Sequence, residues 1–369
     1  MGVMQSDITA EAGVIRCLVA DLRNAVAAAA TVIERRNTIP VLGCLHIVPG
    51  KGELMISGTN LDAWLTVRCP ARAAQAEPFC MPAPVLKALL SGAALEDEVT
   101  IRREKDVLTF EIGPVTARLR DLIPAADWPT PPQVEGVPVQ VGEAALVKLI
   151  DSVRFAISTE ETRYYLNGIF LTGINGRLAG VATDGHTLAR YCSAEPWDFP
   201  GVIFPRTTVA ALRWRLVPGC NRTVSIAVEA PANRMSIAGD GWSMVCKAID
   251  GTFPDYGRVI PARVDDPGYA ILSRETLLRL PDPASDGSRA IKLDLENAKA
   301  LVRDVLFSLD VAMPIEAHGR FSIGFNGKYL RQIARAFGTL RIEATSPGDA
   351  AHILTDDPDL TVVLMPMRV

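Results

Sequence analysis

Apolar and polar residues alternate along many short stretches of the chain. Examples are Leu54-x-Ile56, Val99-x-Ile101, Leu108-x-Phe110 and Val224-x-Ile226-x-Val228. Because residues two apart in a strand point to the same face, this alternation predicts short strands with one buried face. Gly and Pro residues between the stretches mark turns. The pattern therefore predicts antiparallel sheets built from many short strands.

Stretches with helical spacing of apolar residues separate these strands. Three of them are expected to open successive parts of the chain, over Val14–Ile33, Gly142–Ile157 and Arg274–Leu280. Three more follow a short apolar run that ends in Pro or Asn: Val85–Leu90 after Pro82, Val209–Leu216 after Pro205, and Tyr329–Phe337 after Asn326. Pro suits a first helical turn because its missing N–H would be unpaired there, and Asn can cap that turn. Each junction predicts a strand that ends where a helix begins.

This arrangement returns at a nearly constant interval. Pro82, Pro205 and Asn326 follow one another at intervals of 123 and 121 residues. Two other pairs of matching segments lie 124 and 125 residues apart: Thr59-Asn60 with Thr183-Asp184, and Trp128-Pro129 with Phe253-Pro254. The period exceeds that of solenoid repeats and is typical of tandem sister domains. We predict three α+β domains, over residues 1–130, 131–262 and a shortened 263–369, each with two helices packed on an antiparallel sheet.

Charge is distributed unevenly along the chain. The 38 Lys and Arg residues against 42 Asp and Glu residues give a net charge of −4, yet the helices after Pro205 and Asn326 carry cations and no acid. One interpretation is an ordinary solvated face. The other is contact with the phosphates of DNA, without sequence readout because no zinc finger, RNP segment or basic-region helix is present. The candidate DNA-facing residues are Arg36, Lys87, Arg206, Arg213, Lys328, Arg331 and Arg335.

The residue pattern gives little support to catalysis or metal binding. The four His residues are far apart, the seven Cys residues form no C-x-x-C pair, and the chain has neither a P-loop nor a G-x-S-x-G nucleophile turn. We expect no catalytic residue, no metal and no cofactor. Asp7 and Glu11 stand where a secretory leader would be basic, and no run approaches the roughly 20 apolar residues of a membrane helix. We expect a cytoplasmic chain without a membrane partner.

Several motifs, in order along nearly the whole chain, resemble those of one family, the bacterial sliding clamps or beta subunits of DNA polymerase III. These motifs are Arg36-Asn37-Thr38-Ile39-Pro40-Val41-Leu42-Gly43, Ser57-Gly58-Thr59-Asn60-Leu61, Pro124-Ala125-Ala126-Asp127-Trp128-Pro129, Arg163-Tyr164-Tyr165-Leu166-Asn167-Gly168, Val181-Ala182-Thr183-Asp184-Gly185-His186-Thr187-Leu188-Ala189, Asp250-Gly251-Thr252-Phe253-Pro254-Asp255-Tyr256, Ile323-Gly324-Phe325-Asn326 and Val363-Leu364-Met365-Pro366-Met367-Arg368-Val369.

The resemblance implies a fold and a function. Each subunit of the family has three similar domains with helices on a curved antiparallel sheet, and two subunits close head to tail into a six-domain ring around duplex DNA. A closed ring holds DNA by topology, so its contacts can be weak and independent of sequence. The ring tethers polymerase subunits and so raises their local concentration. The resemblance also implies a separate clamp loader that opens the ring, and no catalytic role for the clamp.

The resemblance further implies a pocket for a short apolar motif of partner proteins, between the second and third domains. The matching positions are Arg163, Tyr165, Leu166, Thr183, Gly185, His186, Leu188, Pro254, Arg258, Val259, Asn326, Tyr329, Val363, Met365, Pro366, Met367 and Arg368. Leu, Val and Met side chains suit a deformable apolar socket, and Arg and His suit a polar rim. The alternative is that Leu166, Leu188 and Val259 are ordinary core residues and that Met365–Val369 only completes a sheet.

Three departures from the family pattern affect the partners. Thr187 stands where many members have a basic residue, Glu160-Glu161 adds acids to a loop expected near DNA, and the third domain is contracted around Pro281–Gly287. They leave open a divergent second clamp. The alternative function is an interaction scaffold or decoy that binds clamp partners without encircling DNA.

Overall fold

The structure, a computed structural model, describes residues 13–73, 76–282, 289–304 and 307–369. Asp7 and Glu11, and most of the contracted segment that begins at Pro281, lie outside these ranges. Contacts between residues divide the chain into two units, residues 1–143 with 210–248 and residues 144–209 with 249–369. Residues 131–262, predicted to form the second domain, contribute to both units.

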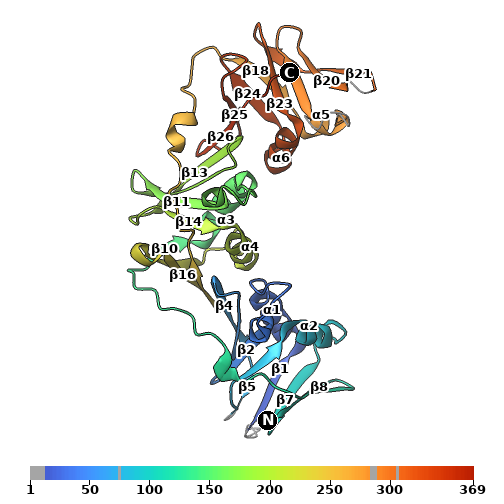
Figure 1. The fold of residues 1–369 in the computed structure, drawn as a ribbon, viewed down its shortest axis with the longest axis vertical. Coiled ribbons are helices and arrows are strands. Elements are labelled where there is room, and N and C mark those ends of the chain that lie inside the picture. The colour runs from blue at the N-terminus through green and yellow to red at the C-terminus, as the bar shows by residue number, and fades with distance from the viewer. Residues whose placement is uncertain (1–12, 74–75, 283–288, 305–306) are drawn as a thin grey trace, which may run out of the picture. The chain divides into compact units, whose positions relative to one another are not determined.

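The first unit contains two antiparallel sheets (Figure 1). The smaller sheet has the order β5 (Arg72–Ala73), β1 (Val14–Leu18), β7 (Glu98–Glu104), β8 (Val107–Ile112) and β9 (Val115–Leu119). The larger has the order β10 (Val139–Gly142), β15 (Thr223–Glu229), β16 (Arg234–Gly239), β17 (Trp242–Lys247), β4 (Ala63–Pro70), β3 (Glu53–Thr59), β2 (Cys44–Pro49) and β6 (Phe79–Pro82). Trp242 of β17 pairs with Val67 of β4, so this sheet joins strands of two predicted domains.

Two helices pack side by side on these strands, α1 (Val19–Ala29) and α2 (Ala83–Ser91) (Figure 1). Helix α1 lies against β1, β3 and β4 and buries Leu22 and Val26. Short 3-10 helices, η1 (Pro40–Gly43), η2 (Ala125–Asp127) and η5 (Ala230–Ala232), connect the longer elements of this unit. One helix face and one sheet face thus enclose the apolar core.

The second unit also contains two antiparallel sheets. The larger has the order β14 (Val202–Pro205), β11 (Gly168–Ile174), β12 (Arg177–Thr183), β13 (Thr187–Pro196), β26 (Leu360–Leu364), β25 (Ala351–Leu354), β24 (Leu340–Ala344), β18 (Gly268–Leu272) and β22 (Glu316–His318). The smaller has the order β21 (Leu309–Pro314), β20 (Lys299–Asp304), β19 (Ala290–Asp294) and β23 (Ser322–Asn326). Leu188 of β13 pairs with Val363 of β26, again joining strands of two predicted domains.

The remaining helices are α3 (Glu143–Val153), α4 (Arg206–Arg215), α5 (Arg274–Arg279) and α6 (Gly327–Phe337), with the 3-10 helices η3 (Arg154–Ala156), η4 (Tyr164–Leu166) and η6 (Tyr256–Val259). Helices α5 and α6 pack against each other (Figure 1). The side chain of Asn326 accepts a hydrogen bond from the backbone N–H of Lys328 at 2.9 Å and so caps α6, as the sequence predicts. The Pro residues also stand as predicted, because β6 ends at Pro82 and β14 at Pro205.

The helix predicted over Val14–Ile33 is wrong at its start. Residues Val14–Leu18 form strand β1, and the helix begins at Val19. The β-branched pair Val14-Ile15 and the alternate residue Cys17 are buried, and Ile15 pairs with Ile101 of β7. Sheet pairing across 86 residues of chain therefore decides the structure of a segment whose local spacing also suits a helix.

The repeated Thr-Asn/Asp segments form the same turn. The Thr59 hydroxyl donates to the carbonyl of Ala63 at 2.9 Å, and the Thr183 hydroxyl donates to that of Thr187 at 2.8 Å. The side chains of Asn60 and Asp184 each accept hydrogen bonds from two backbone N–H groups, two and three residues further on. The sequence repeat thus corresponds to a repeated hydrogen-bond pattern.

No described helix is long and apolar enough to cross a membrane. In the same ranges no group of three or more His, Cys, Asp or Glu residues is arranged to hold a metal ion.

Candidate functional site

A hollow of about 290 Å³ lies in the second unit where β13 and β26 pair. It is lined by Arg163, Tyr165, Leu166, Thr183, Gly185, His186, Thr187, Leu188, Pro254, Asp255, Tyr256, Val259, Val363 and Met365. Eleven of these residues belong to the predicted pocket, so segments up to 202 positions apart in sequence meet here. We call this hollow the partner pocket.

The floor of the partner pocket is apolar and well packed. Leu166, Leu188 and Val363 are at most 3% exposed and form one cluster with Phe253. The walls are different, because Val259 is 45% exposed and Met365 is 40% exposed. Leu166 and Leu188 are thus core residues and pocket residues at once, whereas Val259 and Met365 leave apolar surface open to solvent. Such concave apolar surface is typical of ligand sites.

The Thr183–Thr187 turn presents His186 at the pocket. The carboxylate of Asp184 accepts hydrogen bonds from the backbone N–H groups of His186 and Thr187, at 2.9 and 2.7 Å. Gly185 has φ +89°, a conformation that glycine adopts without strain. The carbonyl of His186 accepts a hydrogen bond from the N–H of Met365 at 2.8 Å. The turn therefore positions both His186 and the C-terminal segment.

Two ion pairs lie at the rim of the partner pocket. Arg163 donates from Nε and Nη2 to the carboxylate of Glu160, at 2.8 and 2.7 Å, and Nη2 also donates to the carbonyl of Asp184 at 3.0 Å. The hydrogen bonds within this pair lower the pKa of Glu160 and raise the pKa of Arg163. Arg258 donates to Asp255 at 2.8 Å. Both rim cations are thus already bound to carboxylates of the chain itself.

Three lining residues are absent from the predicted pocket: Asp255, Tyr256 and Thr187, the last of which the sequence marks only as a departure from the family pattern. All three lie inside the motifs that resemble the sliding-clamp family, and their position in those motifs is the signal that could have identified them. Thr187 is only 2% exposed, and Tyr256 is partly covered, so that burial raises the pKa of its hydroxyl.

Six predicted members do not line the partner pocket: Arg258, Asn326, Tyr329, Pro366, Met367 and Arg368. The ring of Tyr329 lies 5.7 Å from that of His186. Burial, the charge of Asp184 and a hydrogen bond with Asp184 raise the pKa of Tyr329 to about 12. Asn326 caps α6, and the N–H of Met367 donates to the carbonyl of Gly324 at 2.8 Å. Asn326 and Met367 thus support neighbouring elements.

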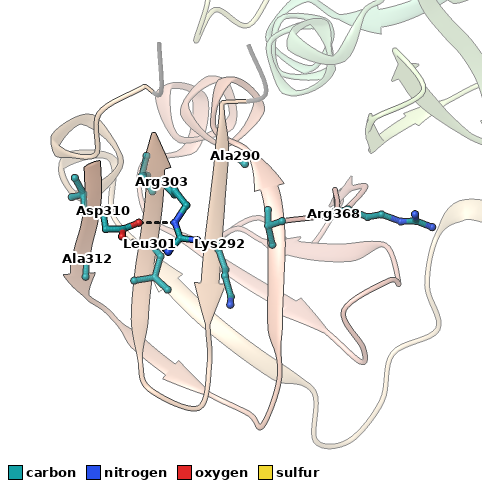
Figure 2. A pocket seen from close by; sticks show the side chains of 10 residues that line it. Ala290, Lys292, Leu301, Arg303, Asp310, Ala312 and Arg368 are labelled. Carbon is teal, nitrogen blue, oxygen red and sulfur yellow. Dashed lines mark hydrogen bonds and ion pairs between the residues drawn. The ribbon is translucent and has the colours of Figure 1, made fainter. Parts of the chain in front are cut away.

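Arg368 lines another hollow, of about 550 Å³, on the four-stranded sheet (Figure 2). Its other lining residues include Lys292, Arg303 and Asp310, and the last two form an ion pair at 2.7 Å. Figure 2 shows Arg368 projecting away from this ion pair. The prediction that Arg368 lines the partner pocket is therefore not supported by this geometry, because Met367 pairs with Gly324 and the chain is directed to the other hollow.

The candidate DNA-facing residues fall into two groups. The exposed ones are Arg36, after α1; Lys87, on α2; Arg206, at the start of α4; and Lys328 and Arg335, on α6. Arg213 is half-buried and donates to the carbonyl of Leu216 at 3.4 Å. Exposed cations thus occur on α2, α4 and α6, the three helices that follow the repeated Pro or Asn.

Arg331 is the exception among these cations. Its side chain is 10% exposed, forms an ion pair with Asp282, and donates to the carbonyls of Leu277 and Leu280 at 3.1 and 2.8 Å. A cation at the end of a helix satisfies carbonyls that have no partner in the helix. Arg331 therefore holds the end of the six-residue helix α5. The prediction that it faces DNA is not supported by this geometry.

Comparisons with known proteins agree with the fold. Family descriptions of the DNA polymerase III beta subunit match residues 15–107, as its N-terminal domain, and residues 140–255, as its central domain. The beta sliding clamp of Caulobacter vibrioides is 32% identical over 360 residues, covering 92% of this chain and 95% of the relative. That of Pseudomonas aeruginosa is 32% identical over 356 residues, with the same coverage. The chain belongs to the bacterial DNA polymerase III beta subunit family.

Solved structures of sliding clamps confirm the predicted fold class. The clamp from Pseudomonas aeruginosa bound to griselimycin has a TM-score of 0.88 at 28% identity, covering 97% of this chain and all of that one. The clamp from Caulobacter crescentus has a TM-score of 0.86 at 30% identity, covering 96% of this chain and all of that one. The protein is thus a sliding clamp, a non-catalytic processivity factor of DNA replication.

Proposed function

We propose that this clamp is a cytoplasmic homodimer that closes head to tail around duplex DNA. Strand β9 forms one edge of the five-stranded sheet, and β21 forms one edge of the four-stranded sheet. An edge strand offers backbone N–H and C=O groups to another chain. When β9 of each protomer pairs with β21 of its partner, the dimer contains two such interfaces and has closed twofold symmetry. A dimer of the 39.7 kDa chain has a mass of about 79 kDa.

The exposed cations on α2, α4 and α6 supply the contact with DNA. Lys87, Arg206, Lys328 and Arg335 are long, exposed residues on the three helices that follow the repeated Pro or Asn. Such side chains contact phosphates and read no bases, so the ring can move along the duplex. A few exposed cations suffice, because encirclement rather than affinity retains the ring.

The partner pocket tethers DNA polymerase subunits, the clamp loader and other proteins that carry a clamp-binding motif. The observation that carries this proposal is the pairing of a buried apolar floor, Leu166, Leu188 and Val363, with open apolar walls, Val259 and Met365. A peptide with one or two large apolar side chains would bury these walls and gain most of its binding energy there. Tethering raises the local concentration of the polymerase at the primer end.

The decisive experiment loads the labelled clamp onto nicked circular DNA and then linearises the DNA. The expected result is retention on the circle and loss from the linear product, with a sedimentation mass near 79 kDa at micromolar concentration. A mass near 40 kDa, with equal retention on both DNAs, contradicts ring closure. Peptide binding without retention on the circle would favour the alternative, a scaffold or decoy for clamp partners.

A further inference from the structure

The cation at the rim of the partner pocket already holds a carboxylate. The guanidinium of Arg163 presents a two-pronged edge, Nε and Nη2, and the carboxylate of Glu160 occupies both prongs. Nη2 is bound a second time, by the carbonyl of Asp184. Two parallel hydrogen bonds between guanidinium and carboxylate are the strongest and most directional form of this pair. A ligand that reaches the pocket therefore finds the Nε and Nη2 edge of Arg163 already occupied by the carboxylate of Glu160.

The loop holds Glu160 in place by its backbone. The N–H of Glu160 donates to the hydroxyl of Ser158 at 3.1 Å, and the carbonyl of Glu160 accepts from the side chain of Asn167 at 3.0 Å. Ser158 is itself 1% exposed, and its N–H donates to the carbonyl of Leu166 at 3.1 Å. Because Leu166 is part of the pocket floor, the carboxylate is tied to the pocket rather than to a free surface loop.

The other charges near the rim do not restore a positive field. Asp184 and Asp255 lie beside the same hollow, and Asp255 pairs with Arg258. Arg163 and Arg258 thus face three carboxylates, those of Glu160, Asp184 and Asp255. A rim with more carboxylates than guanidinium groups repels an acidic side chain and tolerates a basic one.

On the basis of the proposed peptide-binding role, we propose that Glu160 is a specificity-determining residue that makes the partner pocket reject an acidic flank next to the apolar motif. An acidic residue of the peptide must displace a carboxylate that is held within the same chain, at high effective concentration. A neutral flank leaves the Glu160–Arg163 pair intact. A basic flank gains from the excess carboxylate charge at the rim, where three carboxylates stand against two guanidinium groups.

The experiment uses fluorescent peptides that carry the clamp-binding motif of a polymerase subunit, with Glu, Gln or Lys placed on either side of the motif. Affinities are measured by anisotropy for the wild-type clamp, for Glu160→Gln and for Glu161→Gln. The second variant removes the same charge from the exposed neighbouring residue and serves as the matched control. Thermal melts show that the three proteins are equally folded.

The Glu160→Gln variant is expected to bind the Glu-flanked peptide about two- to five-fold more tightly and the Lys-flanked peptide more weakly by a similar factor, the range typical of an exposed ion pair. The Gln-flanked peptide should be unaffected. Equal changes for all three peptides, or equal effects of Glu161→Gln, overturn the role of Glu160. Failure of every peptide to bind every protein overturns the partner pocket itself, and with it this inference.

Discussion

Gly185 lies directly against the guanidinium of Arg163. A Cβ atom at position 185 would stand 2.5 Å from Nη1 of Arg163, and the backbone of Gly185 has φ +89°. A side chain here would strain the turn and displace the rim cation together. The close approach ties the shape of the His186 turn to the position of Arg163.

We predict that Gly185→Ala lowers the free energy of unfolding by about 1–2 kcal/mol, the cost of a left-handed backbone with a Cβ. Peptide binding should weaken roughly fivefold because Arg163 and His186 both shift. Gly176→Ala is the control, since Gly176 also has positive φ, +73°, but a Cβ there would meet nothing within 4 Å. Urea unfolding and peptide anisotropy measure the two effects. Equal peptide affinity for both variants would contradict the contact between Gly185 and Arg163.

Two cations of α6, Arg331 and Arg335, should have different roles, one structural and one in contact with DNA. Arg331→Ala removes hydrogen bonds to two carbonyls at the end of α5, so we expect a loss of about 1–3 kcal/mol in the free energy of unfolding. Arg335→Ala, at an exposed site, should leave stability within about 0.5 kcal/mol. It should instead weaken retention on DNA and reduce the salt dependence by about one charge. Chemical denaturation and salt titrations of DNA binding test both variants. If Arg331→Ala weakened DNA retention and Arg335→Ala lowered stability instead, Arg331 would face DNA.

Local signals in the sequence located the parts of the fold that depend on a few neighbouring residues. Asn326 caps α6 because its side chain reaches an N–H two residues away, and the Thr183 turn closes within five residues. The repeat also matched Thr59-Asn60 with Thr183-Asp184, and these two segments form the same turn. These features require no knowledge of packing.

Other features depend on segments that are distant in sequence. Arg331 and Arg335 look alike on a cationic helix, but only Arg331 meets the end of α5, some 50 residues earlier. Met365 and Arg368 are three residues apart, yet they line different hollows because backbone hydrogen bonds direct the chain from His186 to Gly324. The filled edge of Arg163 depends on a loop conformation that composition does not reveal. Only the assembled packing decides these three cases.

Glu143 should make the stability of the clamp depend on pH in the acid range. Its side chain is 2% exposed and accepts from the N–H of Val217 at 2.6 Å and from Arg222 at 3.0 Å. Burial alone would raise the pKa of Glu143, but the hydrogen bonds from Val217 and Arg222 outweigh it, so the pKa lies below its usual value. The stabilisation is therefore complete above the unfolded-state pKa of about 4.3 and is lost as the pH falls through the lowered folded-state pKa.

We expect Glu143→Gln to lower the free energy of unfolding at pH 7 by about 1–2 kcal/mol, a modest value because Arg222 is 44% exposed. The variant should also lose less stability than the wild type between about pH 5 and pH 3. Denaturant midpoints across this range measure the difference, with exposed Glu34→Gln as the control. Parallel pH curves for wild type and Glu143→Gln would contradict a lowered pKa.

The C-terminal segment should be required for peptide binding up to Met365 and not beyond Met367. The N–H of Met365 is held by the carbonyl of His186, and its side chain forms an open wall of the partner pocket, whereas Arg368 and Val369 line the other hollow (Figure 2). Deleting Met365–Val369 keeps β26, which ends at Leu364, and should weaken peptide binding at least about tenfold without unfolding the protein. Deleting only Arg368-Val369 should leave peptide affinity within about twofold. Anisotropy titrations with one labelled peptide compare the two truncations. If the shorter deletion weakens binding as much as the longer one, the last two residues act on the pocket through the pairing of Met367 with Gly324.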